Sequence, residues 1–174
     1  MPRLFDQTRT AALILAVAAA TLGGAWIFQA LGHAPCELCL KQRIPYYAGV
    51  PLAALALALA RAGLGGAAQA ALAALALLFA GSAVFGAYHA GVEWGVWPGP
   101  SDCAGPIGRI GSTNDLLRQL QAVKVVRCDE VTLRVFGLSL AVWNALISLS
   151  LAVVAGLGAT RPAQGARSSL GHLR

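Results

Sequence analysis

Four long runs without charged residues constrain the fold of this 174-residue chain more than any other feature. About 20 consecutive apolar residues span the hydrocarbon core of a bilayer. The runs predict membrane-spanning helices at about residues 11–31, 44–60, 67–89 and 136–159. Their Ala- and Leu-rich composition favours helices over strands, and an unpaired strand cannot exist in lipid. We therefore predict an all-α membrane protein, a four-transmembrane-helix bundle in a single domain over residues 1–160, with a tail over 161–174.

The charge content agrees with a membrane protein. Only 11% of the residues are charged, whereas a soluble domain needs about 25% to cover its surface. The hydrophobic content of 57% argues against intrinsic disorder. The net charge is +6, but the basic residues are scattered and form no stretch that would follow a phosphate backbone. We therefore expect contact with the lipid bilayer and no binding of nucleic acid.

The first apolar run has an alternative interpretation as a cleaved signal peptide, with Arg3 and Arg9 as its basic end. Its apolar part is longer than the usual core of about 7–15 residues, and Pro35 would lie close to the cleavage site. We therefore interpret the run as a retained helix. Between the second and third runs, Gly63, Gly65 and Gly66 predict a tight turn and an antiparallel helical hairpin.

The cysteines decide the orientation of the predicted bundle. Four spans place both termini and the turn at Arg61 on one side of the membrane, and the loops 32–43 and 91–135 on the other side. All four cysteines lie in these two loops. Disulfides persist in oxidising compartments, so we expect periplasmic loops and cytoplasmic termini. The somewhat higher density of basic residues near the termini agrees with this orientation.

The second loop carries a segment with the pattern of a short amphipathic helix, STNDLLRQLQAVKVV over residues 112–126. Its first residues can cap a helix, and its leucines share one face. Such a helix either lies flat in the membrane interface or packs over the end of the bundle. The tryptophans near the predicted boundaries are expected to be interfacial anchors: Trp94, Trp97 and Trp143.

Cys36 and Cys39 form a CxxC motif just before the second span, and three interpretations compete. A static disulfide would close a very small loop and constrain little of the unfolded chain. A zinc site needs further ligands, and although His33 and His89 are candidates, no standard ligand spacing emerges. A redox pair fits the spacing best, because neighbouring thiols close and reopen a disulfide with little rearrangement. We therefore predict a redox pair and no metal site.

The position of Cys39 supports the redox interpretation. At the start of a helix, free backbone N–H groups stabilise a thiolate. Arg43 follows four residues later, on the same face if the helix has begun by Cys39, and its guanidinium would lower the pKa of this thiol further. The alternative interpretation of Arg43 is an arginine that extends from the membrane boundary into water.

Cys103 lies in a Pro- and Gly-rich part of the second loop, and Cys128 follows the predicted amphipathic helix. Their separation of 25 residues is compatible with a structural bridge. A loop disulfide next to a CxxC motif at the membrane edge also suggests two pairs that exchange electrons. Since the chain shows no haem or flavin motif, a membrane quinone is the simplest final electron acceptor.

These motifs resemble a known family. The segment CELCLKQR fits the pattern C-x-L-C-x-x-x-R, and YHAGVEWGVWPGPSDC leads to the third cysteine, followed later by the fourth. Together with four spans, and over roughly residues 10–158, this closely resembles the DsbB family of the bacterial inner membrane. The resemblance implies a thiol:quinone oxidoreductase that reoxidises a periplasmic, DsbA-like thioredoxin-fold oxidase. Two electrons would pass to ubiquinone or menaquinone, and we expect a monomer that meets its partner transiently.

The resemblance also implies a role for each cysteine. Cys103 would form the mixed disulfide with the partner, and Cys128 would be its loop mate. Cys36 would exchange with the loop pair, while Cys39 would face the quinone with Arg43 beside the quinone oxygen.

Further residues lie near the same predicted membrane depth. Tyr46, Tyr47 and His89 would either shape the quinone pocket or pack within the bundle. Glu93 and Trp94 belong to the matching start of the second loop, and chemistry assigns them no role.

Two alternative functions are compatible with parts of the pattern. A quinone-reducing oxidoreductase similar to vitamin K epoxide reductase also passes electrons from thiols to quinone, but its CxxC is expected in a late helix. The other alternative is a membrane protein with static disulfides or a metal-handling role. Trapping free thiols before and after the addition of quinone would distinguish these functions, because static disulfides would show no quinone-dependent change.

Overall fold

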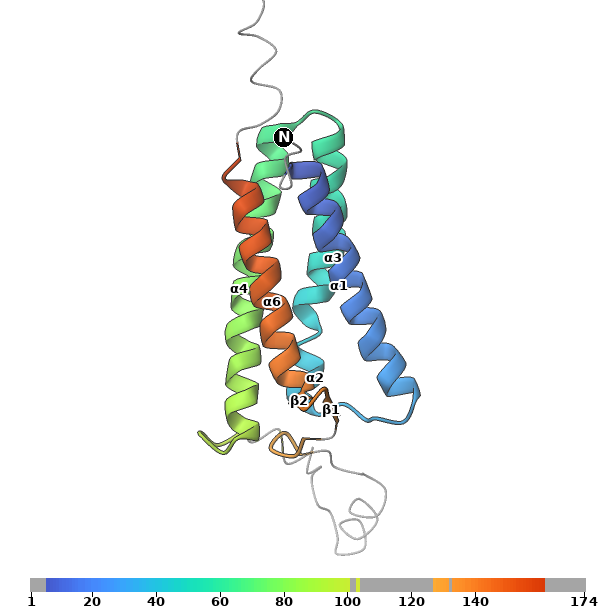
Figure 1. Cartoon of the computed structure of the whole chain (residues 1–174), viewed down its shortest axis with the longest axis vertical. Coiled ribbons are helices and arrows are strands. Elements are labelled where there is room, and N and C mark those ends of the chain that lie inside the picture. Colours follow the sequence, from blue (N-terminus) through green and yellow to red (C-terminus); the bar gives the residue numbers. More distant parts are fainter. Residues whose placement is uncertain (1–5, 101–102, 104–126, 132, 162–174) are drawn as a thin grey trace, which may run out of the picture.

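The computed structural model describes residues 6–100, 103, 127–131 and 133–161. Within these residues, four long helices run side by side, with a short helix and a two-stranded hairpin at one end (Figure 1). In chain order, the elements are α1 (Gln7–Ala30), α2 (Glu37–Lys41), α3 (Ile44–Arg61), α4 (Gly65–Glu93), β1 (Arg134–Val135), β2 (Leu138–Ser139) and α6 (Leu140–Ala159). The helices α1, α2 with α3, α4 and α6 give four spans that are long and apolar enough to cross a membrane. The predicted four-helix membrane bundle is confirmed.

Local signals in the sequence set the ends of the long helices. The Asp6 side chain caps α1 and accepts a hydrogen bond of 2.7 Å from the N–H of Thr8. Ser139 caps α6 in the same way through the N–H of Val142. Pro45 lies in the first turn of α3, where its missing N–H costs nothing. Gly63 has a φ of +75° and makes the tight turn from α3 to α4, as predicted.

The helices pack through aromatic rings and through small residues. α3 packs between α1 and α4, and α4 packs along α6. The ring of Phe79 contacts Tyr46 edge-on, with the ring centroids 5.4 Å apart, and α4 meets α6 closely at Gly86 and Ala145. The fully buried side chains of α1 belong to the same core: Ala11, Ile14 and Ala18. α1 is therefore part of the bundle, as the interpretation of a retained helix requires.

The two ends of the bundle differ in chemistry. The start of α1, the end of α6 and the turn after α3 lie at one end, and α2 with the β-hairpin lies at the other (Figure 1). The four cysteines gather at this second end, where Cys36 and Cys128 are buried in an apolar cluster with Leu38 and Val92. Towards the same end α1 leans away from α6 (Figure 1). The start of α1 and the end of α6 thus lie at the opposite end of the bundle from the sulfur chemistry.

Several boundaries differ from those predicted. The fourth helix begins at Leu140 and not at Phe136, because residues 134–139 form an antiparallel hairpin. Phe136 and Gly137 both have positive φ, of 51° and 81°, and make its two-residue turn. The first loop was predicted as residues 32–43, yet five of these residues form α2. The predicted amphipathic helix over 112–126 and almost all of the tail over 161–174 lie outside the described residues.

Candidate functional site

The CxxC motif places one sulfur at the start of a helix. Cys36 is the residue before α2, and its Sγ accepts a hydrogen bond of 3.2 Å from the backbone N–H of Cys39. The N-terminus of the helix therefore stabilises negative charge on Cys36, and the prediction that it acts on Cys39 is wrong. The pKa of Cys36 is lowered to about 5, first by the hydrogen bond from the Cys39 thiol and then by His89, against the opposing effect of burial.

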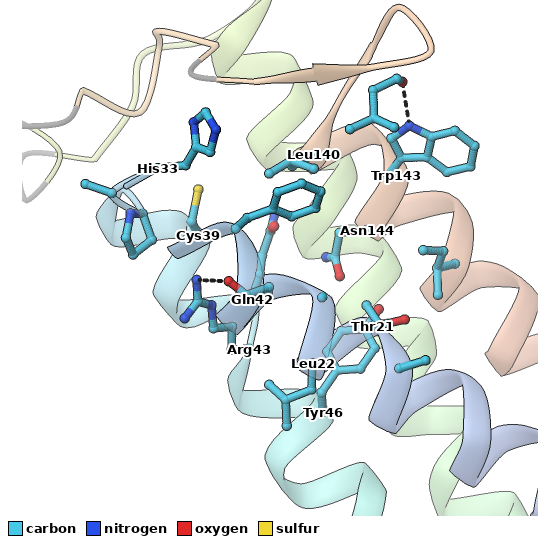
Figure 2. A pocket seen from close by; sticks show the side chains of 18 of the residues that line it. Thr21, Leu22, His33, Cys39, Gln42, Arg43, Tyr46, Leu140, Trp143 and Asn144 are labelled. Carbon is cyan, nitrogen blue, oxygen red and sulfur yellow. Dashed lines mark hydrogen bonds between the residues drawn. The ribbon is translucent and has the colours of Figure 1, made fainter. Parts of the chain in front are cut away.

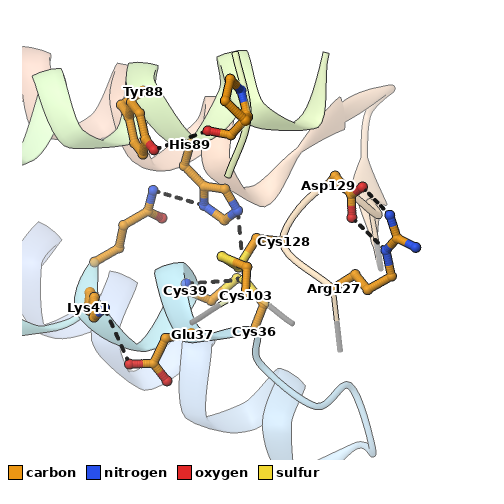
Figure 3. Close-up of a disulfide and its surroundings, with 12 residues drawn as sticks. Cys36, Glu37, Cys39, Lys41, Tyr88, His89, Cys103, Arg127, Cys128 and Asp129 are labelled. Atoms are coloured by element: carbon orange, nitrogen blue, oxygen red, sulfur yellow. Dashed lines mark hydrogen bonds and ion pairs between the residues drawn. A yellow bond between two sulfur atoms is a disulfide. The ribbon is translucent and has the colours of Figure 1, made fainter. Parts of the chain in front are cut away.

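The two thiols lie next to a buried histidine (Figure 3). Their sulfur atoms are 2.7 Å apart, close enough to form a disulfide with little movement. His89 of α4 places Nε2 at 3.7 Å from the Sγ of Cys36. The amide nitrogen of Gln42 lies 3.1 Å from the other ring nitrogen, Nδ1. When this amide donates to Nδ1, the ring proton sits on Nε2 and points at the sulfur.

The second cysteine pair is oxidised and packs against the first. Cys103 and Cys128 form a disulfide with their Cα atoms 5.4 Å apart. Cys128 is only 1% exposed, while Cys103 is partly exposed. Both belong to the apolar cluster that contains Cys36 and Cys39 (Figure 3). The structure therefore brings two redox-capable pairs into one cluster, one as a disulfide and one as free thiols.

A pocket of about 410 Å³ opens beside the CxxC motif. Its walls come from α1, the segment around α2, the hairpin and α6 (Figure 2). Cys39 and Arg43 line one side, and Trp143 and Asn144 of α6 line another. Apolar and aromatic residues make up most of the remaining wall, among them Leu22, Phe28, Phe136, Leu140 and Ile147. This composition suits a flat, largely apolar ligand with a few polar atoms.

Arg43 is held at the edge of the pocket by α1. Its guanidinium donates to the carbonyl oxygen of Ala25 at 3.3 Å (Figure 2). It also donates to the Oε1 of Gln29 at 2.6 Å. A guanidinium has five N–H donors, so two such contacts leave donors for a ligand. Deeper in the bundle, the hydroxyl of Tyr46 lies 3.0 Å from the Oγ of Ser148. This hydrogen bond fixes the Tyr46 ring, which forms part of the pocket wall.

Asn144 brings an unpaired donor to the pocket. Its Nδ2 is buried and has no hydrogen-bond partner among the described residues. A buried donor without a partner costs about 1–3 kcal/mol. Because Asn144 lines the pocket, a rotation of its amide would bring this donor to a carbonyl oxygen bound there.

The comparison with known families agrees with this geometry. The family model of disulfide bond formation protein DsbB matches residues 7–158, a range that contains the four cysteines and all of the four spans except the last residue of α6. The chain belongs to the DsbB family. Separate searches of the curated proteins and of the solved structures found no match.

Membership of the DsbB family establishes the general activity. The chain is a multi-pass membrane protein and an oxidoreductase of disulfide-bond formation. Proteins of the DsbB family use quinones. The match favours the DsbB family over the predicted alternative, an oxidoreductase similar to vitamin K epoxide reductase.

Not all of the sequence-predicted residues line the pocket. Cys39, Arg43 and Tyr46 do, but His89 and Tyr47 do not. His89 instead faces the thiol of Cys36, and the Tyr47 hydroxyl accepts a hydrogen bond from Trp26 on α1. The apolar runs did not show that α2 and α3 are separate helices, and they could not place α4, which carries His89, relative to them.

The start of the second loop has a structural connection. Glu93, at the end of α4, accepts a hydrogen bond from the hydroxyl of Ser139, at the start of α6. This contact ties the two helices together beside the thiols. Trp94 follows as the C-terminal cap of α4 and is exposed, in agreement with an interfacial anchor.

Sequence reasoning missed most of the pocket wall, and three of the missed residues carry polar groups or an aromatic ring beside the site: Gln42, Trp143 and Asn144. Asn144 carried a usable signal, because a polar side chain inside a 20-residue apolar helix is expensive unless it has a function. Trp143 was interpreted as an interfacial anchor, but its ring lines the pocket and its Nε1 donates to the carbonyl oxygen of Val135. Gln42 had no signal beyond its position next to Arg43.

Proposed function

We propose that this DsbB-family protein is a thiol:quinone oxidoreductase that reoxidises a periplasmic, DsbA-like thioredoxin-fold oxidase. Two electrons pass to ubiquinone or menaquinone, which sustains disulfide formation in secreted proteins. The observation that carries the proposal is that the CxxC motif contacts both the pocket and the loop disulfide. Cys39 borders the apolar pocket, and Cys36 packs in one cluster with the Cys103–Cys128 disulfide. Electrons entering at the disulfide therefore have a short path to the pocket.

The residues of the pocket fit a quinone head group. The pocket's volume of about 410 Å³ falls within the usual range of about 300–1,000 Å³ for small-molecule sites. The guanidinium of Arg43 and the unpaired Nδ2 of Asn144 are donors for the two carbonyl oxygens of such a ring. A bound quinone supplies an acceptor for two electrons and two protons. The apolar wall limits the access of water to the Cys39 sulfur, and the Arg43 cation at the edge of the pocket would stabilise negative charge on the reduced ring.

The loop disulfide receives the electrons first. A thiolate of the partner attacks the Sγ of Cys103, the more exposed of the two bridged sulfurs. A bond from the partner to Cys103 forms, the Cys103–Cys128 bond breaks, and Cys128 leaves as the thiolate. The second partner thiol then attacks its own bonded sulfur, so the partner leaves oxidised and Cys103 is released. The loop pair is now a dithiol that carries two electrons.

The CxxC pair receives the electrons second. In its oxidised form, Cys36 is attacked by a loop thiolate, which releases Cys39 as a thiolate beside the pocket. The remaining loop thiol closes the loop disulfide and releases Cys36. Because the pKa of Cys36 is lowered to about 5, it is a good leaving group at neutral pH. The pair is then the dithiol that reduces the quinone.

We place the protein in the bacterial inner membrane, as a monomer with periplasmic cysteines and cytoplasmic termini. Support comes from the position of the four cysteines at the end of the bundle opposite the start of α1 and the end of α6. An oxidising compartment is where such thiol chemistry operates. A membrane-impermeant thiol reagent on intact, reduced cells should label the cysteines; labelling that needs a broken inner membrane would reverse the orientation.

Quinone reduction by the purified chain tests the proposal. With a reduced thioredoxin-fold protein and a soluble quinone analogue, the chain should turn over catalytically, and Cys39→Ala should abolish turnover. Asn144→Leu removes one hydrogen bond of about 0.5–1.5 kcal/mol, so the KM for quinone should rise about 2- to 13-fold. Ser150→Ala, on the exposed side of α6, is the matched control with an unchanged KM. If the purified chain shows no thiol-dependent reduction of quinone, the proposal is refuted.

A further inference from the structure

Three metal-ligating side chains converge beside the pocket. Cys36 precedes α2, Cys39 lies within it, and His89 comes from α4 (Figure 3). Their two sulfurs and one ring nitrogen all lie within 4.8 Å of one another. Cys36 and His89 are buried, and Cys39 borders the pocket, which gives a small ligand a way in. The sequence spacing did not reveal this cluster, because His89 is 50 residues from Cys39 and only the fold brings them together.

The distance from sulfur to nitrogen matches a tetrahedral metal centre, and the distance between the two sulfurs is shorter than such a centre needs. A Zn²⁺ ion with sulfur ligands at about 2.3 Å and a nitrogen ligand at about 2.0 Å holds sulfur and nitrogen about 3.5 Å apart and two sulfurs about 3.8 Å apart. The Sγ of Cys36 already lies 3.7 Å from the Nε2 of His89. The two sulfurs, at 2.7 Å, must move apart by about 1 Å, which small side-chain rotations supply.

The surroundings of the cluster favour a cation. Two thiolates in an apolar cluster are two costly negative charges, and a divalent cation cancels them. A histidine that binds through Nε2 must donate its Nδ1 proton to a neighbour. Gln42 is in contact with Nδ1, and a half-turn of its amide presents the oxygen that accepts this proton. Three protein ligands also leave a fourth position open for water.

We propose that the reduced Cys36 and Cys39, together with His89, bind one thiophilic divalent cation such as Zn²⁺, and that the cation inhibits the protein. Binding forms two sulfur–metal bonds, displaces any proton that the two thiols still hold, and transfers no electrons. The Cys36–Cys39 disulfide has no thiolates and does not bind. The metal is therefore a competitor of disulfide formation and not a resident cofactor. Occupancy does not depend on the proposed quinone reaction, but the inhibition rests on it.

The test uses the full chain with Cys103→Ser and Cys128→Ser, so that Cys36 and Cys39 are the only thiols. Reduced protein is titrated with Zn²⁺ against a chromophoric chelator, and Co²⁺ reports thiolate ligation by its charge-transfer absorption. We expect one ion per reduced chain and no binding after oxidation. Equal binding by oxidised protein, or none by reduced protein, would overturn the site.

Variants at His89 test the third ligand. His89→Gln should weaken Zn²⁺ binding by at least about tenfold, whereas His33→Gln, the control near the same motif, should leave it unchanged. His89→Cys restores a ligand, so it should bind tightly and add a third thiolate to the Co²⁺ spectrum; this variant keeps the test valid if His89→Gln does not fold. Unchanged affinity in folded His89→Gln would refute the three-ligand site.

A kinetic measurement separates this proposal from the proposed function. Zn²⁺ added to the reduced wild-type chain should slow quinone reduction, and a chelator should restore the rate. If the chain binds Zn²⁺ but never reduces quinone, the proposed function fails and the metal site stands. If quinone reduction is normal and the reduced chain takes up no Zn²⁺, only the metal site fails.

Discussion

Replacing Gly86 by alanine should weaken the contact between α4 and α6. A Cβ atom at Gly86 would lie 2.9 Å from the backbone nitrogen, 3.0 Å from the Cα and 3.1 Å from the Cβ of Ala145. Two of these three atoms belong to the backbone of α6, so no side-chain rotation relieves the overlap. The helices must separate, and this kind of overpacking costs about 1–3 kcal/mol.

A matched variant on the same helix isolates that cost. Gly81 also lies in α4, and a Cβ there would meet no atom within 4 Å among the described residues. Both substitutions gain the same helix propensity, about 1 kcal/mol. The difference between Gly86→Ala and Gly81→Ala is therefore the steric cost alone, about 1–3 kcal/mol. Ala145→Gly added to Gly86→Ala should recover only part of it, because the backbone contacts remain.

Unfolding of the detergent-purified chain in increasing SDS, followed by tryptophan fluorescence and circular dichroism, measures the free energies of unfolding. We expect Gly81→Ala to be as stable as the wild type or more stable, and Gly86→Ala to be less stable. Equal free energies for the two variants would refute the close contact between α4 and α6. The contact matters for the site, because α4 carries His89 and α6 carries Asn144.

Arg43→Ala should raise the KM for a soluble quinone analogue because the pocket loses its guanidinium donors, with Arg43→Lys intermediate; an unchanged KM in steady-state kinetics would make Arg43 only an anchor to α1. Cys103→Ser or Cys128→Ser should abolish turnover with the protein partner while quinone still oxidises Cys36 and Cys39. Normal partner turnover by Cys103→Ser would make the loop bridge structural. In reduced, chelator-treated protein, the Cys36 pKa of about 5 keeps this thiol ionised down to about pH 6. Its alkylation rate should therefore be flat from neutral pH to that value and fall below it; a rate that falls near the ordinary thiol pKa of 9.0 would contradict this.

The large features of the fold could be predicted from the sequence because the bilayer imposes them. A span must be long and uncharged, so the four apolar runs located the four helices, and the cysteines outside these runs indicated the end of the bundle with the chemistry. Cys39 and Arg43 do line one pocket. They do so although the helix breaks between them, at a junction that the continuous pattern did not reveal.

Details that depend on a single residue could not be predicted. The CxxC spacing indicated a helix N-terminus, but the residue at which α2 begins decides which sulfur it stabilises, and that sulfur is Cys36. The hairpin at 134–139 has strands of two residues, too short for alternation to distinguish from a helix start. The position of His89 depends on how α4 packs against α2, which no local pattern contains.

The order in which the two cysteine pairs oxidise tests the electron path most directly. The chain is fully reduced, mixed with one equivalent of a soluble quinone analogue, and quenched with an alkylating reagent at successive times; mass spectrometry then locates the remaining thiols. We predict that the Cys36–Cys39 disulfide forms first and that the Cys103–Cys128 disulfide follows at its expense. In Cys39→Ala, quinone should leave Cys103 and Cys128 reduced. Oxidation of the loop pair at the wild-type rate in Cys39→Ala, or no loss of thiols in the wild type, would contradict the path from loop disulfide through CxxC to quinone.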